Sequence, residues 1–156
     1  MHAIIEDNQG KLLRMEFPVY TFHIDYSRHV SNLVYVQWME SARCTLLEAA
    51  GLPIAKMGEM GFLPVLTETQ IRYHSPLYLG DTARLEAWVS EFRGASAWVE
   101  YRITRPDGAL AAHGRQKGLF VRADNLRPYR FPPEQRALFE PFIRTEECGD
   151  EPAPRG

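Results

Sequence analysis

The chain has little cysteine, little excess charge and no long hydrophobic run. Its 156 residues include two cysteines, Cys44 and Cys148, a count that indicates free thiols in a reducing compartment rather than a disulfide framework. The formal net charge of −2 gives no electrostatic reason to expect nucleic acid or an anionic membrane as a partner. No apolar run is long enough to cross a bilayer, and acids interrupt the N-terminal segment early. We therefore expect a cytoplasmic protein with neither a membrane span nor a secretory leader.

Several motifs of common active sites are also missing. There is no Gly-x-Ser-x-Gly elbow, so a serine-hydrolase mechanism has no support, and there is no glycine-rich phosphate loop. His2, His74 and His113 are scattered without metal-ligand spacing. Cys44 lies among apolar residues of a predicted helix, where a thiol is typically inert. We expect neither a metal nor an organic cofactor.

The first half of the chain predicts one strand and one long helix. Residues 1–12 are polar and predict a flexible end, followed by a strand over 13–20. A helix is predicted from Ser31 or Asn32 until Gly51, because apolar side chains recur there at helical spacing. They occupy more sides than a surface helix needs, so this helix must be covered by other elements.

The hydrophobic period changes to two beyond Phe62. Alternation predicts consecutive antiparallel strands around 65–73, 83–89, 97–103 and 110–121. Prolines then open a short helix that ends at Phe142, and a tail over 145–156 is predicted to be disordered. The pattern indicates a single α+β domain over 13–144, in which a curved antiparallel sheet wraps around the helix. An unpaired edge of such a sheet is often closed by a second subunit.

Polar side chains gather just before the predicted long helix. Asp25, His29 and Asn32 place a carboxylate, an imidazole and an amide at its N-terminus. The helix dipole and the unpaired N–H groups favour developing negative charge there, so a carbonyl could be polarised and attacked. Each residue also has a simpler interpretation: Asp25 as a turn former, His29 as bound to backbone, and Asn32 as a helix N-cap.

The combination and order of these residues resemble the signature of hotdog-fold acyl thioesterases. The nearest groups are the 4-hydroxybenzoyl-CoA thioesterase-like family and the acyl-ACP thioesterases. The resemblance spans about 17–121 and is carried by Asp25, His29, Val30, Asn32, Tyr35, Trp38, Glu40, Arg43, Gly51, Ile71, Arg72, Tyr73, Pro76, Gly80 and Asp81.

This resemblance implies a hotdog fold and the hydrolysis of acyl-CoA or acyl-ACP thioesters. Asp25 matches the catalytic carboxylate and would act as general base toward water or as a nucleophile, two roles that the sequence leaves open. His29 and Asn32 complete the catalytic set. The expected substrate-binding residues are Tyr35, Leu63, Pro64 and Val65 along the acyl group and His74 and Ser75 toward the phosphates of coenzyme A. The relatives are dimers or dimers of dimers, so a homodimer or homotetramer with interfacial active sites is expected.

Departures from the family pattern leave the mechanism open. His23 replaces an acid, Arg28 replaces a glycine, and Ser75 with Pro76 stands near the place of a further acid of the acyl-ACP enzymes. Two alternatives stay open. The pair of Asp25 and His29 also permits a hotdog dehydratase or hydratase, and Arg28 points to an acyl-CoA-binding protein without catalysis. The sequence does not decide the acyl group, the carrier (coenzyme A or acyl carrier protein) or the number of subunits.

Overall fold

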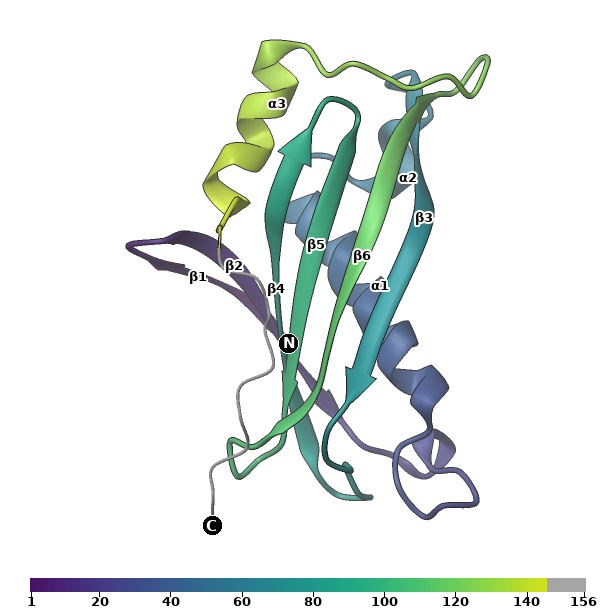
Figure 1. Ribbon diagram of the computed structural model, residues 1–156, viewed down its shortest axis with the longest axis vertical. Helices are drawn as coiled ribbons and strands as arrows, with labels where there is room; N and C mark the ends of the chain where they lie inside the picture. The colour runs from purple at the N-terminus through teal and green to yellow at the C-terminus, as the bar shows by residue number, and fades with distance from the viewer. Residues whose placement is uncertain (146–156) are drawn as a thin grey trace.

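The structure is a computed structural model that describes residues 1–145 as an antiparallel sheet crossed on one face by a long helix (Figure 1). The strand order is β1-β2-β4-β5-β6-β3. The strands are β1 His2–Asp7, β2 Gly10–Pro18, β3 Phe62–Tyr73, β4 Thr82–Arg93, β5 Ser96–Thr104 and β6 Leu110–Arg122. The helices are α1 Asn32–Ala49, α2 Ile54–Met57 and α3 Pro133–Phe139, with 3-10 turns η1 Thr21–His23 and η2 Glu140–Phe142. The expected α+β architecture is confirmed. Apart from Thr145, the tail predicted to be disordered lies outside the described residues.

Helix α1 begins and ends close to where the sequence predicts. Ser31 is the N-cap, and its Oγ accepts a hydrogen bond from the N–H of Leu33 at 3.4 Å. Of the two residues at which we expected the helix to begin, Ser31 is therefore the cap and Asn32 is the first helical residue. Gly51 ends the helix with a φ of +85°, a conformation that glycine adopts without strain.

Burial along α1 follows one face of the helix. Its buried residues are Val34, Tyr35, Trp38, Met39, Ala42, Leu46 and Leu47. The opposite face carries exposed polar side chains, including Gln37, Glu40 and Glu48. The helix is thus covered on one side, where its apolar residues pack against the sheet, and not on most sides as its composition predicted.

The sheet separates an apolar inner face from a charged outer face. Along β4, the buried Ala83, Leu85 and Ala87 alternate with Arg84 and Glu86, as the period of two predicts. On the outer face the guanidinium groups of Arg102 and Arg115 lie over the rings of Trp88 and Trp98, at 5.2 and 4.0 Å from the ring centroids. These contacts order a polar surface that faces away from α1.

The N-terminal segment that we expected to be flexible is a strand, so that prediction is wrong. β1 pairs with β2 in an antiparallel hairpin from His2–Met15 to Asp7–Gly10. Arg144 clamps its turn by donating two hydrogen bonds to the Asp7 carboxylate, at 2.7 and 3.1 Å, and one to the carbonyl of Gly10. The Arg144 side chain also lowers the pKa of Asp7. Side chains of β1 are mostly exposed, so its sequence carries little hydrophobic signal.

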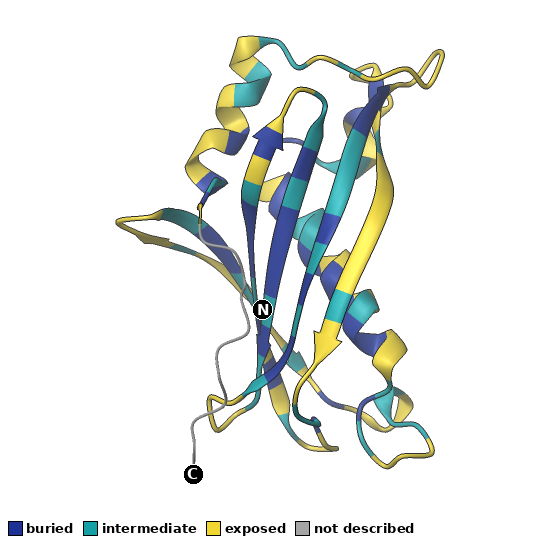
Figure 2. Cartoon of the chain, viewed as in Figure 1, coloured by how far each residue is buried: buried dark blue, intermediate teal, exposed yellow. Residues whose placement is uncertain are grey.

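β3 is a long edge strand whose only neighbour among the strands of residues 1–145 is β6. Almost its whole length is exposed, as Figure 2 shows, including the apolar side chains of Leu63, Val65, Leu66 and Tyr73. Such an edge offers unpaired backbone groups to another strand. Among the described helices, none is both long and apolar enough to span a membrane.

Candidate functional site

The polar residues that precede α1 lie in a small closed loop. Ile24 and Val30 pair as an isolated antiparallel bridge, and the carbonyl of Asp25 accepts the N–H of Arg28 at 3.0 Å. The N–H of Asp25 donates to the carbonyl of His29 at 3.3 Å. Arg28 has a φ of +66°, a left-handed conformation that favours glycine. The loop needs a left-handed residue at the position where the resembling family carries glycine.

The carboxylate of Asp25 is only partly engaged. Its Oδ1 accepts the N–H of Ser27 at 2.8 Å, the bond expected of a turn-forming Asp. Its Oδ2 has no hydrogen-bond partner within residues 1–145, and the residue is half-buried. The turn-forming interpretation is therefore confirmed for one oxygen, and the other oxygen is free to act on a water or a substrate.

A cavity of about 200 Å³ lies at the N-terminus of α1. Its lining comes from the loop before α1, the first turn of α1, the end of β3 and the loop after β3: His29, Val30, Asn32, Tyr35, Tyr73, His74, Ser75 and Pro76. The structure thus brings together His29, Asn32, Tyr35, His74 and Ser75 of the predicted site. Asp25 belongs to the adjoining loop and not to the lining of this cavity.

Hydrogen bonds fix the walls of this cavity. Tyr73 donates from its hydroxyl to the carbonyl of Asn32 at 3.0 Å, and Ser75 donates to the carbonyl of Leu110 at 2.6 Å. Burial raises the pKa of the Tyr35 hydroxyl. Tyr73 was missed as a site residue, although the alternation along its strand places it on the same face as Ile71. The predicted catalytic residues belong to the loop before α1, whereas this tyrosine reaches the cavity from the edge of the sheet.

The first turn of α1 offers a free hydrogen-bond donor. The N–H groups of Leu33 and Val34 donate to the side chain and carbonyl of Ser31. The N–H of Asn32 has no acceptor among the residues that the structure describes, and neither has its side-chain amide. His29, on the cavity wall, donates weakly from Nδ1 to the carbonyl of Val30 at 3.4 Å. A helix N-terminal N–H beside a polar cavity suits an anionic oxygen.

His23, which replaces an acid of the family pattern, has a structural position. Its Nδ1 accepts the N–H of Tyr20 at 3.0 Å, and its ring packs against Phe22 and Trp38 at centroid distances of 4.3 and 5.6 Å. Burial lowers the pKa of this imidazole, which favours the neutral form that the Tyr20 bond requires. His23 supports the loop from behind.

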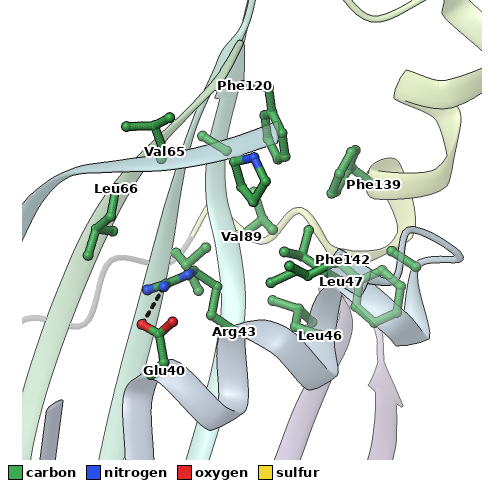
Figure 3. A pocket seen from close by; sticks show the side chains of 16 residues that line it. Glu40, Arg43, Leu46, Leu47, Val65, Leu66, Val89, Phe120, Phe139 and Phe142 are labelled. Carbon is green, nitrogen blue, oxygen red and sulfur yellow. Dashed lines mark hydrogen bonds and ion pairs between the residues drawn. The ribbon is translucent and has the colours of Figure 1, made fainter. Parts of the chain in front are cut away.

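A second cavity, also about 200 Å³, lies between the C-terminal half of α1, the sheet and α3 (Figure 3). Its walls are mostly apolar and include Leu46, Val65, Phe120, Phe139 and Phe142. The ion pair between Glu40 and Arg43 borders it (Figure 3). Pro64 and Val65, predicted to contact the acyl group, line this cavity, whereas Leu63 is exposed and does not.

The predicted substrate-binding residues therefore fall into two groups at opposite ends of α1. Asn32 and Leu46 are separated along the helix by a rise of roughly 21 Å, at 1.5 Å per residue. The buried Trp38 and Met39 fill the helix face between them. Within this chain, the cavity lined by His29 (the His29 cavity) and the cavity lined by Val65 (the Val65 cavity) are separate. Among residues 1–145, no group of three or more His, Cys, Asp or Glu side chains is arranged to hold a metal ion.

Comparison with protein families gives a match over most of the chain. Residues 19–139 match the thioesterase-like superfamily. The putative acyl-CoA thioesterase YneP of Bacillus subtilis is 28% identical over 97 residues, which cover 62% of this chain and 70% of that protein. The chloroplastic acyl-acyl carrier protein thioesterase ATL3 of Arabidopsis thaliana is 26% identical over 138 residues, covering 86% and 70%.

Solved structures with the same fold include thioesterases. A DHNA-CoA thioesterase of Staphylococcus aureus superposes with a TM-score of 0.74 at 19% identity and covers 81% of this chain and 87% of its own. The hypothetical protein SAV2348 of the same organism, solved in complex with CoA, superposes with a TM-score of 0.80 at 18% identity, covering 90% and 91%. At these identities the superpositions establish the hotdog fold, as the sequence predicted.

Proposed function

The chain belongs to the thioesterase-like superfamily, and we propose that it hydrolyses acyl thioesters at the His29 cavity with Asp25 as the reacting carboxylate. The observation that carries this assignment is the free Oδ2 of Asp25 in a loop beside the unpaired N–H of Asn32. A thioester needs little more than these two groups. Its carbonyl is already activated, so attack at carbon and stabilisation of the resulting oxyanion suffice.

Asp25 acts on the carbonyl carbon, either directly or through a water. In the general-base route Oδ2 takes a proton from water as the water oxygen bonds to that carbon, and the thiolate leaves. In the nucleophilic route the carboxylate itself displaces the thiolate, and water then cleaves the mixed anhydride. In both routes the oxygen of the carbonyl becomes negative and accepts the Asn32 N–H. Loss of such a donor typically slows a reaction about 100- to 1,000-fold.

The apolar cavity at Val65 is the proposed place of the acyl group. It has the walls that an acyl chain or ring needs, but it lies far along α1 from Asp25 of the same subunit. The exposed edge of β3 resolves this separation if two copies pair there. Two antiparallel β3 strands related by a two-fold axis place the Val65 end of one beside the Tyr73 end of the other. We therefore propose a homodimer as the catalytic unit.

The test is thiol release from a panel of aromatic, short-chain and long-chain acyl-CoA esters. Asp25→Asn keeps the Oδ1 acceptor for Ser27 and removes the base, so kcat should fall by about 100-fold or more. Asp124→Asn, on an exposed surface turn, is the matched control and should retain wild-type activity. The same reactions on acyl-ACP identify a carrier-protein substrate.

Each outcome separates the proposal from its rivals. Full activity of Asp25→Asn would show that the site is assigned wrongly, while leaving the family unaffected. Enoyl product without free thiol would identify a dehydratase or hydratase. Binding of acyl-CoA without turnover of any ester would identify a non-catalytic binding protein.

A further inference from the structure

The Val65 cavity is open at one end and closed at the other. At the open end Glu40 is exposed, and Val65 and Leu66 are 42% and 41% exposed. The lining residues at the closed end are buried: Leu47, Ala50, Phe139 and Phe142. Figure 3 shows Glu40 and Leu66 on one side of the cavity and the two phenylalanines on the other. An acyl group that enters from the β3 edge would therefore end against Phe139 and Phe142.

The closed end is built by α3 and η2, and contacts with β4 hold these elements in place. The ring of Phe139 stacks on that of Phe92 with centroids 4.8 Å apart, and Arg136 donates to the carbonyl of Phe92 at 3.0 Å. The N–H of Arg144, shortly after η2, donates to the carbonyl of Val89 at 2.8 Å. Because the segment is bonded to β4 at both of its ends, its phenylalanine rings form a fixed wall.

The size of the cavity limits the length of the acyl group. Its volume is about 200 Å³. A methylene group takes up roughly the space of a water molecule, about 30 Å³, so the cavity holds about six or seven carbon atoms. The thioester carbon itself would lie at the open end, where the proposed dimer brings the Asp25 loop of the second copy. A longer chain would fit only if the closed end moved.

The closed end is also apolar. Among the described residues, the polar side chains that line the cavity are Glu40 and Arg43, and both lie toward the open end (Figure 3). These two form an ion pair, and Arg43 also donates to the side chain of Gln116. A hydroxyl group at the closed end would lose its hydrogen bonds to water and meet no polar side chain in exchange. The cavity therefore favours an acyl group that is apolar at its far end.

We infer that the preferred substrates carry unsubstituted acyl groups of about seven or eight carbon atoms in all, and that Phe139 and Phe142 set this upper limit. Turnover of these esters rests on the proposed thioesterase function, whereas binding of the acyl group does not. Aromatic acyl groups that carry a hydroxyl opposite the thioester carbon are disfavoured, because the hydroxyl would be buried at the closed end.

The kinetic test measures kcat/KM for hexanoyl-, octanoyl-, decanoyl- and dodecanoyl-CoA. The wild type should prefer octanoyl-CoA to decanoyl-CoA by about 10-fold or more, because one surplus methylene in an apolar pocket typically costs at least that factor. Phe139→Leu shortens a side chain at the closed end, so the ratio of decanoyl to octanoyl should rise by about 10-fold. Ala50→Val fills the same end, so the ratio of octanoyl to hexanoyl should fall by about 10-fold.

Phe131→Leu is the matched control. Phe131 packs against Phe139 with ring centroids 5.7 Å apart, but it does not line the cavity. Its loss should destabilise the same aromatic cluster and leave the chain-length ratios within about twofold of the wild type. Equal shifts in both phenylalanine variants would overturn the inference. Ala50→Val removes no core side chain, so an unchanged ratio in that variant would contradict the inference even if Phe139→Leu did not fold.

A pair of ring substrates tests the polarity of the closed end. Benzoyl-CoA should be hydrolysed about 10- to 100-fold faster than 4-hydroxybenzoyl-CoA, since an apolar pocket rejects an added hydroxyl by about this factor. Equal or faster hydrolysis of 4-hydroxybenzoyl-CoA would show that the far end of the acyl group does not lie against Phe139 and Phe142.

A binding measurement separates this inference from the proposed activity. Calorimetry on the full chain should show octanoate binding about 10-fold or more tightly than dodecanoate, with a smaller difference in Phe139→Leu. If no thioester is hydrolysed but octanoate is still preferred, the proposed activity fails and the acyl site stands. Tighter binding of dodecanoate by the wild type would overturn the inference even if thioesters are hydrolysed.

Discussion

Arg28 holds a left-handed backbone conformation in the loop that carries Asp25. Its φ of +66° brings the Cβ close to backbone atoms, at a cost of roughly 1–2 kcal/mol for a non-glycine residue. Arg28→Gly should therefore raise the free energy of unfolding by about 0.5–1 kcal/mol, after the greater flexibility of glycine in the unfolded chain is subtracted. Urea denaturation followed by circular dichroism measures this change.

The effect should depend on the backbone and not on the charge. Because the Arg28 side chain is exposed, Arg28→Ala removes the guanidinium but keeps the Cβ, and its stability should match that of the wild type within about 0.5 kcal/mol. If alanine stabilised the protein as much as glycine, the gain would come from removal of the arginine side chain and the strain argument would be wrong.

At the residue scale, the sequence predicted which side chains gather but not how each is used. The cluster of His29 and Asn32 follows from its place before the helix, because local spacing determines it. Ser31 acts as the helix cap, and the Asp25 carboxylate accepts a backbone N–H in the turn. Both roles depend on the backbone angles of the folded loop, so the residue types alone could not predict them. Tyr73 reaches Asn32 across 41 residues of sequence, a contact that no local pattern contains.

Helix α1 crosses β6 at a close approach that Gly114 makes possible. A Cβ at this position would lie 2.9 Å from the carbonyl oxygen of Gln70 and 2.9 Å from Cε of Met39. Met39 can shift, but the oxygen belongs to the paired backbone of β3. Gly114→Ala should therefore lower the free energy of unfolding by about 1–3 kcal/mol through overpacking.

Gly118, four residues farther along β6, is the matched control. A Cβ there meets nothing closer than the carbonyl oxygen of Val65 at 4.0 Å, so Gly118→Ala should cost less than about 1 kcal/mol. Thermal unfolding of the two variants in parallel gives the comparison. Equal losses of stability would indicate that β6 does not tolerate alanine at either glycine position, and that the close approach of α1 is not the cause.

At the element scale, hydrophobic periodicity predicted those strands that bury one face and expose the other. β4, β5 and β6 bury one face, so alternation fixes their extent closely. β1 buries almost nothing, and its pairing with β2 comes from backbone hydrogen bonds and from the distant Arg144. A strand stabilised in this way has no signature in its own side chains, which is why a flexible end was predicted there.

The two separate cavities are a property of the whole molecule. The sequence predicted one acyl-binding path along α1 past Tyr35 and Val65, because the resemblance implies that both residues contact the acyl group. In the structure they lie at opposite ends of β3 and line different cavities. Sequence spacing cannot predict this separation, because it depends on the direction in which β3 runs relative to α1. That direction is a property of the tertiary structure. Because the two cavities are separate, pairing of two chains at the exposed β3 edge decides whether they can form one site.

Pairing of two β3 edges predicts that a single charge on this strand separates the subunits. Leu66 is 41% exposed on β3, and Leu66→Lys would place an uncompensated charge in the interface, at a cost of about 2–5 kcal/mol per contact. Sedimentation velocity should show a dimer for the wild type and a monomer for this variant. Ile4→Lys, on the opposite edge strand β1, should remain dimeric.

Thiol release should fall when the dimer is lost, because the Asp25 loop then loses the partner's apolar cavity. A Leu66→Lys variant that stays dimeric would exclude β3 as the interface, and an active monomer would place the acyl group within one subunit.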